Sequence, residues 1–269
     1  MERLGSYTSP LSSVGPAGRL LRYSSCLWLL VSRSLKVRYR RSVLGFAWSL
    51  AYPLASMAVL TVVFSSVFPD LPHYSLYVVV GVLVWGFFSL SCLQAMDSLI
   101  SGAPVLRKVY VPAVVFPLSV VGANLANLLL SLCVLPVVVW ATGAQPGLHL
   151  LWLAGAVVAL LSFTAGLCLA LAAVNLIFND VRYFFEGILL VWFYATPIVY
   201  PVDVIPDHLS VFLWLNPLFW ILEFIRAPLY GGSAPAGIFV VASLGLGFSV
   251  LAGGWALFVR LERRFHLYL

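Results

Sequence analysis

The residues best suited to bind a charged ligand are cations near the start of the chain. Four of them fall within six residues: Lys36, Arg38, Arg40 and Arg41. From residue 46 to residue 68 the chain then carries no charge. A basic cluster beside an apolar run is typical of a membrane interface, where cations attract anionic head groups. Topological anchoring accounts for most of these cations, and a surface for a cytoplasmic partner or an anionic substrate is the additional hypothesis.

The two lysines exclude one kind of phosphate chemistry. A P-loop needs a glycine directly before its lysine, whereas Lys36 follows Leu35 and Lys108 follows Arg107. The chain is therefore not expected to hydrolyse ATP by that route. If transport is driven by ATP, the ATPase must be another polypeptide.

The cysteines and histidines do not form a metal-binding pattern. Four cysteines are scattered without CxxC spacing: Cys26, Cys92, Cys133 and Cys168. Three of them lie in apolar runs, where a thiol acts as a small hydrophobic group, and the four histidines are isolated. No metal site and no cofactor are predicted on this chain.

The apolar segments contain almost no ionisable side chain. Glu186 is the exception, and it lies near Asp180 and Arg182. Ion-coupled transporters place carboxylates or cations at mid-membrane, so the sequence argues against a secondary transporter. It also argues against an intramembrane hydrolase, because no predicted span contains a cluster of catalytic residue types. Asn124 and Asn127 are three residues apart on one helix face. Interhelical hydrogen bonding is the main interpretation of this pair, and the lining of a polar pathway is the alternative.

The composition sets the class of protein, since 62% of the residues are hydrophobic, 9% are charged and the mean hydropathy is +1.05. Soluble domains carry about 25% charged residues, so we predict an all-α integral membrane protein. About 20 apolar residues span a bilayer. Six segments qualify as transmembrane helices, at about 45–68, 74–96, 112–141, 149–178, 184–201 and 236–259.

The segments outside these predicted spans carry their own expectations. Residues 1–18 are polar and interrupted by proline and glycine, which predicts a flexible N-terminus and no cleavable signal peptide. Residues 19–43 carry an apolar stripe and a basic face, which predicts an amphipathic helix at the cytoplasmic interface. Residues 202–235 are apolar but broken by Pro206, Pro217 and Pro228. That pattern predicts two short re-entrant helices at the outer interface.

The distribution of cations predicts the orientation of the chain. In a six-span topology, every Lys and Arg except Arg226 falls on one side of the membrane. An excess of these residues marks the cytoplasmic side, so both termini are expected in the cytoplasm. Because this partition explains the net charge of +6, the charge does not indicate binding to nucleic acid.

Aromatic residues gather toward the predicted outer half of the spans, among them Trp192, Tyr194 and Tyr200. An interfacial aromatic belt explains many of them. Sugar rings also stack on aromatic faces, so the same residues would suit a polysaccharide path. Both interpretations remain open at this level.

Four strings carry a more specific signal: LKVRYRRSVLGFAWSLAYPL (35–54), LRKVYVPAVVFPLS (106–119), NLIFNDVRYFFEGILLVWFYATPIVYP (175–201) and LNPLFWILEFIRAPLYGG (215–232). In this order they resemble ABC-2 type transporter permeases, in particular Wzm/TagG-like exporters of lipid-linked polysaccharides such as O-antigen, teichoic acid, galactan or capsule. The likeness runs from about residue 30 to the C-terminus. It departs from the family pattern at Asn179-Asp180, where the family usually has Arg-Asp, and Arg182 is close enough to substitute.

The resemblance implies a homodimer in the bacterial cytoplasmic membrane, paired with two copies of a cytoplasmic ABC ATPase that bind ATP and Mg²⁺. The substrate would be a lipid pyrophosphate-linked glycan, and membrane lipid would surround residues 44–269. Residues 97–111 would form the element that couples to the ATPase, with Arg107, Lys108 and Tyr110 at the contact. A permease for a smaller lipid or drug, and a membrane scaffold that transports nothing, are the alternatives.

The resemblance also assigns roles along the substrate path. The first and fifth spans would line the channel and bring Tyr52, Trp192, Tyr194 and Tyr200 near the polymer. The helix at 19–43 would lie around the inner gate. Its cations Arg38, Arg40 and Arg41 would attract the anionic head group of the substrate.

Overall fold

The computed structural model describes residues 24–39, 47–69, 73–109, 111–143, 148–206, 208, 210–230 and 233–268, and the regular structure within these ranges is helical. The first predicted segment, 1–18, lies outside them. The elements are α2 (Ser24–Tyr39), α3 (Ala47–Phe64), α4 (Tyr74–Leu106), α5 (Val115–Ser131), η1 (Leu132–Val134), α6 (Leu135–Thr142), η2 (Leu148–Leu151), α7 (Trp152–Ile177), α8 (Asp180–Ala195), η3 (Val202–Val204), α9 (Ser210–Leu215), α10 (Pro217–Tyr230), α11 (Gly237–Glu262) and η5 (Phe265–Leu267).

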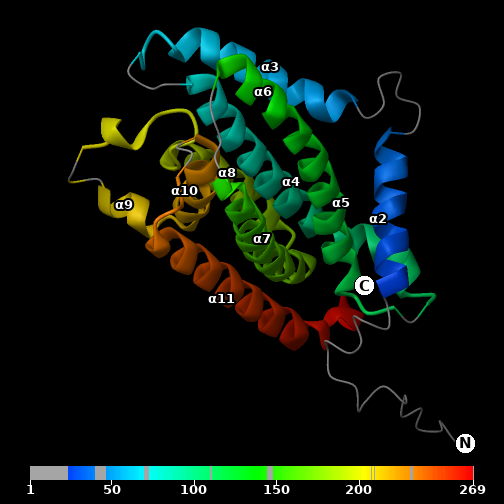
Figure 1. Ribbon diagram of the computed structural model, residues 1–269. Coiled ribbons are helices and arrows are strands. Elements are labelled where there is room, and N and C mark those ends of the chain that lie inside the picture. The colour runs from blue at the N-terminus through cyan, green and yellow to red at the C-terminus, as the bar shows by residue number, and fades with distance from the viewer. Residues whose placement is uncertain are drawn as a thin grey trace, which may run out of the picture.

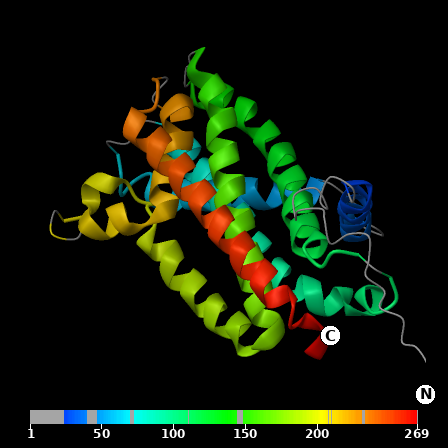
Figure 2. The same cartoon turned by 90° about the horizontal axis from the view of Figure 1, so that it is seen from below.

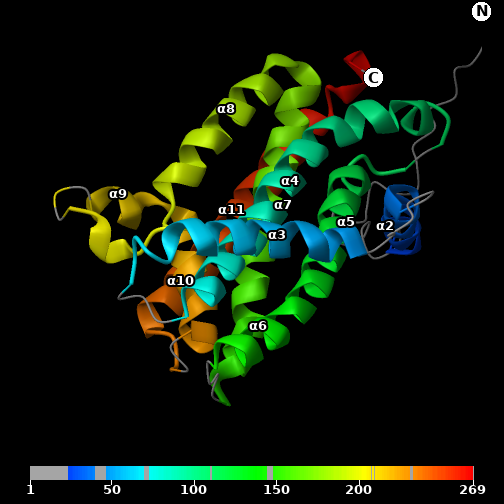
Figure 3. The same ribbon diagram turned by 90° about the horizontal axis from the view of Figure 1, so that it is seen from above.

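Helices α4 and α7 form the centre of the bundle. Their inward side chains include Phe88, Met96 and Leu160, which are almost fully buried. Helices α5, α10 and α11 pack around this pair, and α11 runs along α7 (Figure 2). Helix α3 lies across α4 and α5 (Figure 3), whereas α2 stands beside α5 at the edge of the bundle (Figure 1).

Within the described residues, four helical segments are long and apolar enough to cross a membrane: Tyr74–Leu106, Val115–Thr142, His149–Ile177 and Gly237–Glu262. The other two predicted crossings correspond to shorter helices, since α3 has 18 residues and α8 has 16. The prediction of an all-α, multi-pass membrane protein is therefore confirmed.

The second and fifth predicted spans have different ends in the structure. Helix α4 continues to Leu106, because Leu99 and its neighbours remain buried against the bundle. Helix α8 ends at Ala195, and Thr196 after it has extended backbone, with φ −104° and ψ 133°. The ring of Pro197 disfavours helical backbone in the residue before it, so the apolar run up to residue 201 does not continue as helix.

The third predicted span is divided into two helices by a proline. Pro136 has no backbone N–H, and its ring crowds the carbonyl of Leu132 one turn earlier. The residues at this position, Leu132–Val134, form a tighter 3-10 turn between α5 and α6. The segment Val115–Thr142 thus crosses as a kinked rod.

Helices α7 and α11 approach so closely that glycine is required at their contact. A Cβ atom added to Gly254 would lie 1.9 Å from the carbonyl oxygen of Gly166. Gly247, seven residues earlier on the same face of α11, meets the carbonyl of Ala159, with its added Cβ at 2.8 Å. Small residues of this kind let transmembrane helices pack backbone to backbone.

Helix α2 packs on the bundle through the apolar stripe expected from its sequence. Val31 is buried, and Leu27 and Leu30 pack against the core formed by the ends of α4, α5, α7 and α11. A Cβ atom added to Gly122 on α5 would lie 3.0 Å from Val31 Cγ2. The opposite face carries exposed side chains, including Trp28 and Lys36.

Candidate functional sites

The predicted head-group gate is described at one of its three residues, because Arg40 and Arg41 lie outside the described ranges. Arg38 Nη2 donates to Gln94 Oε1 on α4 at 3.0 Å and to Asn124 Oδ1 on α5 at 2.9 Å. Asn124 Nδ2 donates in turn to Ser91 Oγ and to Gln94 Oε1, both at 3.2 Å. Arg38 therefore fastens the last turn of α2 to two helices of the bundle. The interhelical hydrogen bonding predicted for Asn124 is confirmed.

A second charged cluster joins α4 to the start of α8. Arg182 Nη1 donates to Asp97 Oδ2 across the two helices, and Arg182 Nε donates to Glu186 Oε1 at 3.2 Å within α8. All three side chains are partly exposed, at about two fifths of their surface, with relative values of 39%, 43% and 43%. Arg182 thus provides a cation beside the position where this chain lacks the family arginine.

The predicted coupling region begins as the last turns of α4. Residues 97–106 are helical, and Arg107 and Lys108 follow, both exposed. The third predicted coupling residue, Tyr110, lies outside the described residues. Gly102 packs against Phe116 of α5, since an added Cβ would lie 2.5 Å from two carbons of that ring. The two cations therefore extend from a helix end that is anchored to the bundle.

The predicted channel residues occupy three different environments. Trp192 packs its ring against Phe88, with ring centroids 5.2 Å apart, so it faces the inside of the bundle. Tyr194 on the opposite face is 68% exposed. The hydroxyl of Tyr200 donates to the carbonyl of Tyr194 at 2.7 Å, which brings these two residues together. For Tyr52 the structure places only the backbone, in α3, and the channel role stays a prediction.

Asn216 fixes the C-terminal end of α8 to the start of α10. Trp192 Nε1 donates to Asn216 Oδ1 at 2.9 Å, and Asn216 Nδ2 donates to Thr196 Oγ1 at 2.8 Å. The backbone N–H of Leu218 also donates to Asn216 Oδ1, at 3.1 Å. Asn216 thus acts as an N-cap, and Pro217 occupies the first helical position, where a missing N–H costs nothing.

The structure adds one site that the sequence argument did not assign. Arg226 of α10 is 3% exposed, and its guanidinium donates to the carbonyls of Pro197 at 2.7 Å and Ile198 at 3.1 Å. The same group lies 3.6 Å over the ring centroid of Tyr77 and pairs with Glu223 at 3.5 Å. Arg226 was the cation that did not fit the charge partition, and an arginine inside an apolar helix is itself a signal of a paired, buried charge.

Two tyrosines of α4 hold the same loop from the other side. Tyr74 Oη donates to the carbonyl of Val199 at 2.8 Å, and Tyr77 Oη donates to that of Tyr200 at 3.0 Å. Together with Arg226 they satisfy the carbonyls of the irregular backbone at residues 197–200. We call this group, Tyr74, Tyr77 and Arg226 with the carbonyls of 197–200, the carbonyl clamp.

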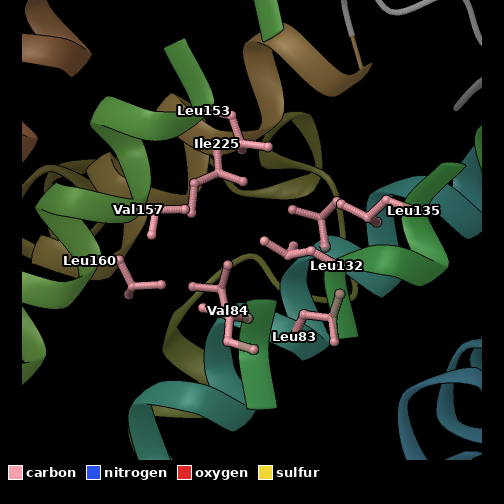
Figure 4. A pocket seen from close by; sticks show the side chains of 10 residues that line it. Leu83, Val84, Leu132, Leu135, Leu153, Val157, Leu160 and Ile225 are labelled. Carbon is pink, nitrogen blue, oxygen red and sulfur yellow. The ribbon is translucent and has the colours of Figure 1, made fainter. Parts of the chain in front are cut away.

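One cavity lies between α4, the kink at η1, α6, α7 and α10 (Figure 4). Its cavity volume is only about 10 Å³, and part of it is open to the outside. Leucine, valine and isoleucine side chains form its walls, among them Val84, Leu135 and Ile225. Cavities with such walls stay dry, and these walls offer a ligand no polar atom.

The cysteines that the structure buries act as packing groups. Cys92 and Cys168 face each other between α4 and α7 with their Sγ atoms 4.0 Å apart, and both are free thiols. Among the described residues, no group of three or more His, Cys, Asp or Glu side chains could hold a metal ion.

Comparisons with known proteins place these features in a family. Residues 25–230 match the sequence model of the ABC-2 type transporter family. A permease protein of an O-antigen export system, RfbA of Myxococcus xanthus, is 36% identical over 219 residues, which are 80% of this chain and 84% of the relative. A protein of the same name from Klebsiella pneumoniae is 30% identical over 244 residues, which are 89% of this chain and 93% of the relative.

The family model covers residues 25–230 and so includes α4, α8 and α10, the helices that carry the Asp97–Arg182–Glu186 cluster and the carbonyl clamp. The resemblance inferred from the four strings is therefore confirmed. The chain belongs to the ABC-2 type transporter family.

Proposed function

We propose that this chain is the permease subunit of an ABC exporter that moves a lipid-linked polysaccharide, of the O-antigen kind, across the bacterial cytoplasmic membrane. The observation that carries the proposal is the near full-length similarity to two permease proteins of O-antigen export systems. The multi-pass, all-helical architecture is that of a transport subunit rather than of a motor.

The proposed topology has six crossings, with both termini in the cytoplasm. Helices α3 and α8 are the two short crossings, because 18 and 16 residues reach only about 24–27 Å at 1.5 Å per residue. A hydrocarbon core is about 30 Å thick, so local thinning of the bilayer would accompany them. Helices α9 and α10, at 6 and 14 residues, are too short to cross and are proposed as the re-entrant helices of the outer gate.

The proposed assembly is a homodimer with two copies of a cytoplasmic ABC ATPase, which bind ATP and Mg²⁺. The absence of a glycine before either lysine supports a separate motor. We expect either a second copy of the chain or the polymer to lie beside α8, because one face of this helix has large exposed side chains. They are Tyr183, Phe184, Leu190, Val191 and Tyr194.

The proposed path starts at the inner interface. The pyrophosphate head group approaches Arg38, Arg40 and Arg41, and ATP binding closes the partner ATPases against the coupling region 97–111. The permease subunits then move apart, and the glycan passes along α3 and α8, where Tyr52, Trp192 and Tyr194 lie, and past Tyr200 in the loop after α8. In this scheme Arg38 has two tasks, because it also fastens α2 to Gln94 and Asn124.

Reversing the charges at the end of α4 tests the partnership with the ATPase. We expect the double variant Arg107→Glu, Lys108→Glu to co-purify with at least about ten times less ATPase than the parent chain. The reason is that two exposed cations at the proposed contact are replaced by anions. The measurement is the molar ratio of P-loop ATPase to tagged permease, determined by quantitative mass spectrometry after solubilisation in mild detergent.

The matched control reverses Arg263 and Arg264, which are also exposed and lie on the same predicted side. This control is expected to keep the ratio of the parent chain. Equal loss in both double variants would mean that net charge matters rather than the end of α4. No loss in either would place the ATPase elsewhere on the chain.

A further inference from the structure

We propose that the ion pair between Asp97 and Arg182 transmits the movement of the coupling region to α8. The inference rests on the proposed function, since it names the residues that connect the ATPase contact to the substrate path. Asp97 is the first residue of the region 97–111 and lies on α4, whereas Arg182 lies in the first turn of α8.

Helix α8 is otherwise held by one narrow face. Phe185 and Leu189 are buried against the bundle, and Trp192 continues this stripe toward the outer end. Its other face is exposed along its length. At the end near the coupling region, a two-residue turn joins α8 to α7, and Arg182 Nη1 donates to Asp97 of α4. A displacement of α4 at residue 97 therefore acts on the first turn of α8.

The segment on the α4 side can carry a displacement. The helix that contains residue 97 runs on to Leu106, with Pro104 inside it, and Arg107 and Lys108 follow. Buried Leu99 and the contact of Gly102 with Phe116 pack that stretch against α5, so it is ordered helix rather than a loop. Force applied at the exposed cations reaches Asp97 about ten residues, or roughly 15 Å, away along the helix.

The energetics separate a transmitting role from a stabilising one. The charged partners are about two fifths exposed, and ion pairs at that exposure contribute little to stability. Removing the pair should thus leave folding and assembly almost unchanged. Loss of transport in a stable complex is therefore the result that a purely structural role would not give.

The same guanidinium provides a matched control. Arg182 Nε bonds Glu186 at 3.2 Å, but Glu186 lies on α8 itself, one turn later. Glu186→Gln removes one carboxylate from Arg182 without cutting the link between helices. Asp97→Asn removes the other carboxylate, and with it the opposite charge that holds Arg182 to α4. The two variants change the charge by the same amount.

The experiment uses the full permease with its ATPase, each variant being the sole copy in its host. Surface polysaccharide is measured on intact cells, and ATP hydrolysis and complex yield are measured on the purified complex. We expect Asp97→Asn to reduce surface polysaccharide roughly tenfold, within the range of coupling between distant sites, with ATP hydrolysis and yield retained. Glu186→Gln should match the parent chain. The charge exchange Asp97→Arg with Arg182→Asp should restore most of the export.

Three results would overturn the inference. In the first, Asp97→Asn exports as much polysaccharide as the parent. In the second, its export falls only in proportion to the yield of assembled complex. In the third, the exchanged pair assembles a complex but does not recover export. A parent complex that hydrolyses ATP but exports no polysaccharide would contradict the proposed function itself, and this inference with it. Normal export by the parent and by Asp97→Asn would contradict the inference alone.

Discussion

Replacing Arg226 with alanine is expected to lower the free energy of unfolding by about 3 kcal/mol or more, the cost of removing one partner from a buried charged network. The guanidinium is 3% exposed and donates to the carbonyls of Pro197 and Ile198. Without it the carbonyl of Ile198 loses the guanidinium donor and that of Pro197 keeps only the Tyr77 hydroxyl at 3.2 Å. Glu223 loses its cation, and the ring of Tyr77 loses its contact. The measurement is equilibrium unfolding of the purified chain by titration with a denaturing detergent.

Two further variants sharpen the result. Arg226→Lys keeps the charge but has a single amine in place of the planar fork, so it should recover only part of the stability. Glu223→Gln changes a side chain that is 27% exposed and keeps a polar group 3.5 Å from the guanidinium, so its effect should be smaller than that of Arg226→Ala. If Arg226→Ala unfolded like the parent chain, the carbonyl clamp would not hold the loop at residues 197–200.

Gly254→Ala is expected to be the most damaging glycine-to-alanine substitution among the glycines that the structure describes. The added Cβ would lie 1.9 Å from the carbonyl oxygen of Gly166, and a backbone atom cannot move aside as a flexible side chain can. Helix α11 would have to shift away from α7, at a cost of about 3 kcal/mol or more in packing. The measurement is the yield of monodisperse protein together with the same unfolding titration.

The neighbouring glycine is a matched control. An alanine at Gly253 meets no heavy atom within 4 Å, and alanine favours a helix over glycine by about 1 kcal/mol. Gly253→Ala should therefore equal or exceed the parent in stability. Equal stability of both alanine variants would mean that the backbones of α7 and α11 are farther apart than the structure places them.

The sequence predicted the features that depend on local chemistry. Apolar length identified the long helices, and the stripe containing Leu27 and Val31 identified the face of α2 that packs inward. The string at residues 175–201, which resembles the family, indicated the fold although the sequence does not show which residues are in contact. The amide of Asn124 could be assigned to interhelical bonding, because a polar group in a membrane needs a partner wherever its helix packs.

The remaining features depend on which segments meet in space. Arg38 donates a hydrogen bond to Asn124, which is 86 residues later in the sequence. Arg226 lies over the ring of Tyr77, from which it is separated by 149 residues. Periodicity gives the face of a helix but not its neighbour, so neither pair could be predicted. The end of α8 was missed for a local reason: hydropathy counts the apolar residues up to 201, but Pro197 excludes helical backbone at Thr196.

The most direct test of the proposed function is the location of the glycan in the native host after the gene for this chain is deleted. We expect surface polysaccharide to be lost and lipid-linked glycan to accumulate on the cytoplasmic side, because synthesis continues while export stops. The wild-type gene on a plasmid should restore the surface polysaccharide. Unchanged surface polysaccharide in the deletion strain, with no lipid-linked glycan retained inside, would contradict the assignment of this chain as a polysaccharide export permease.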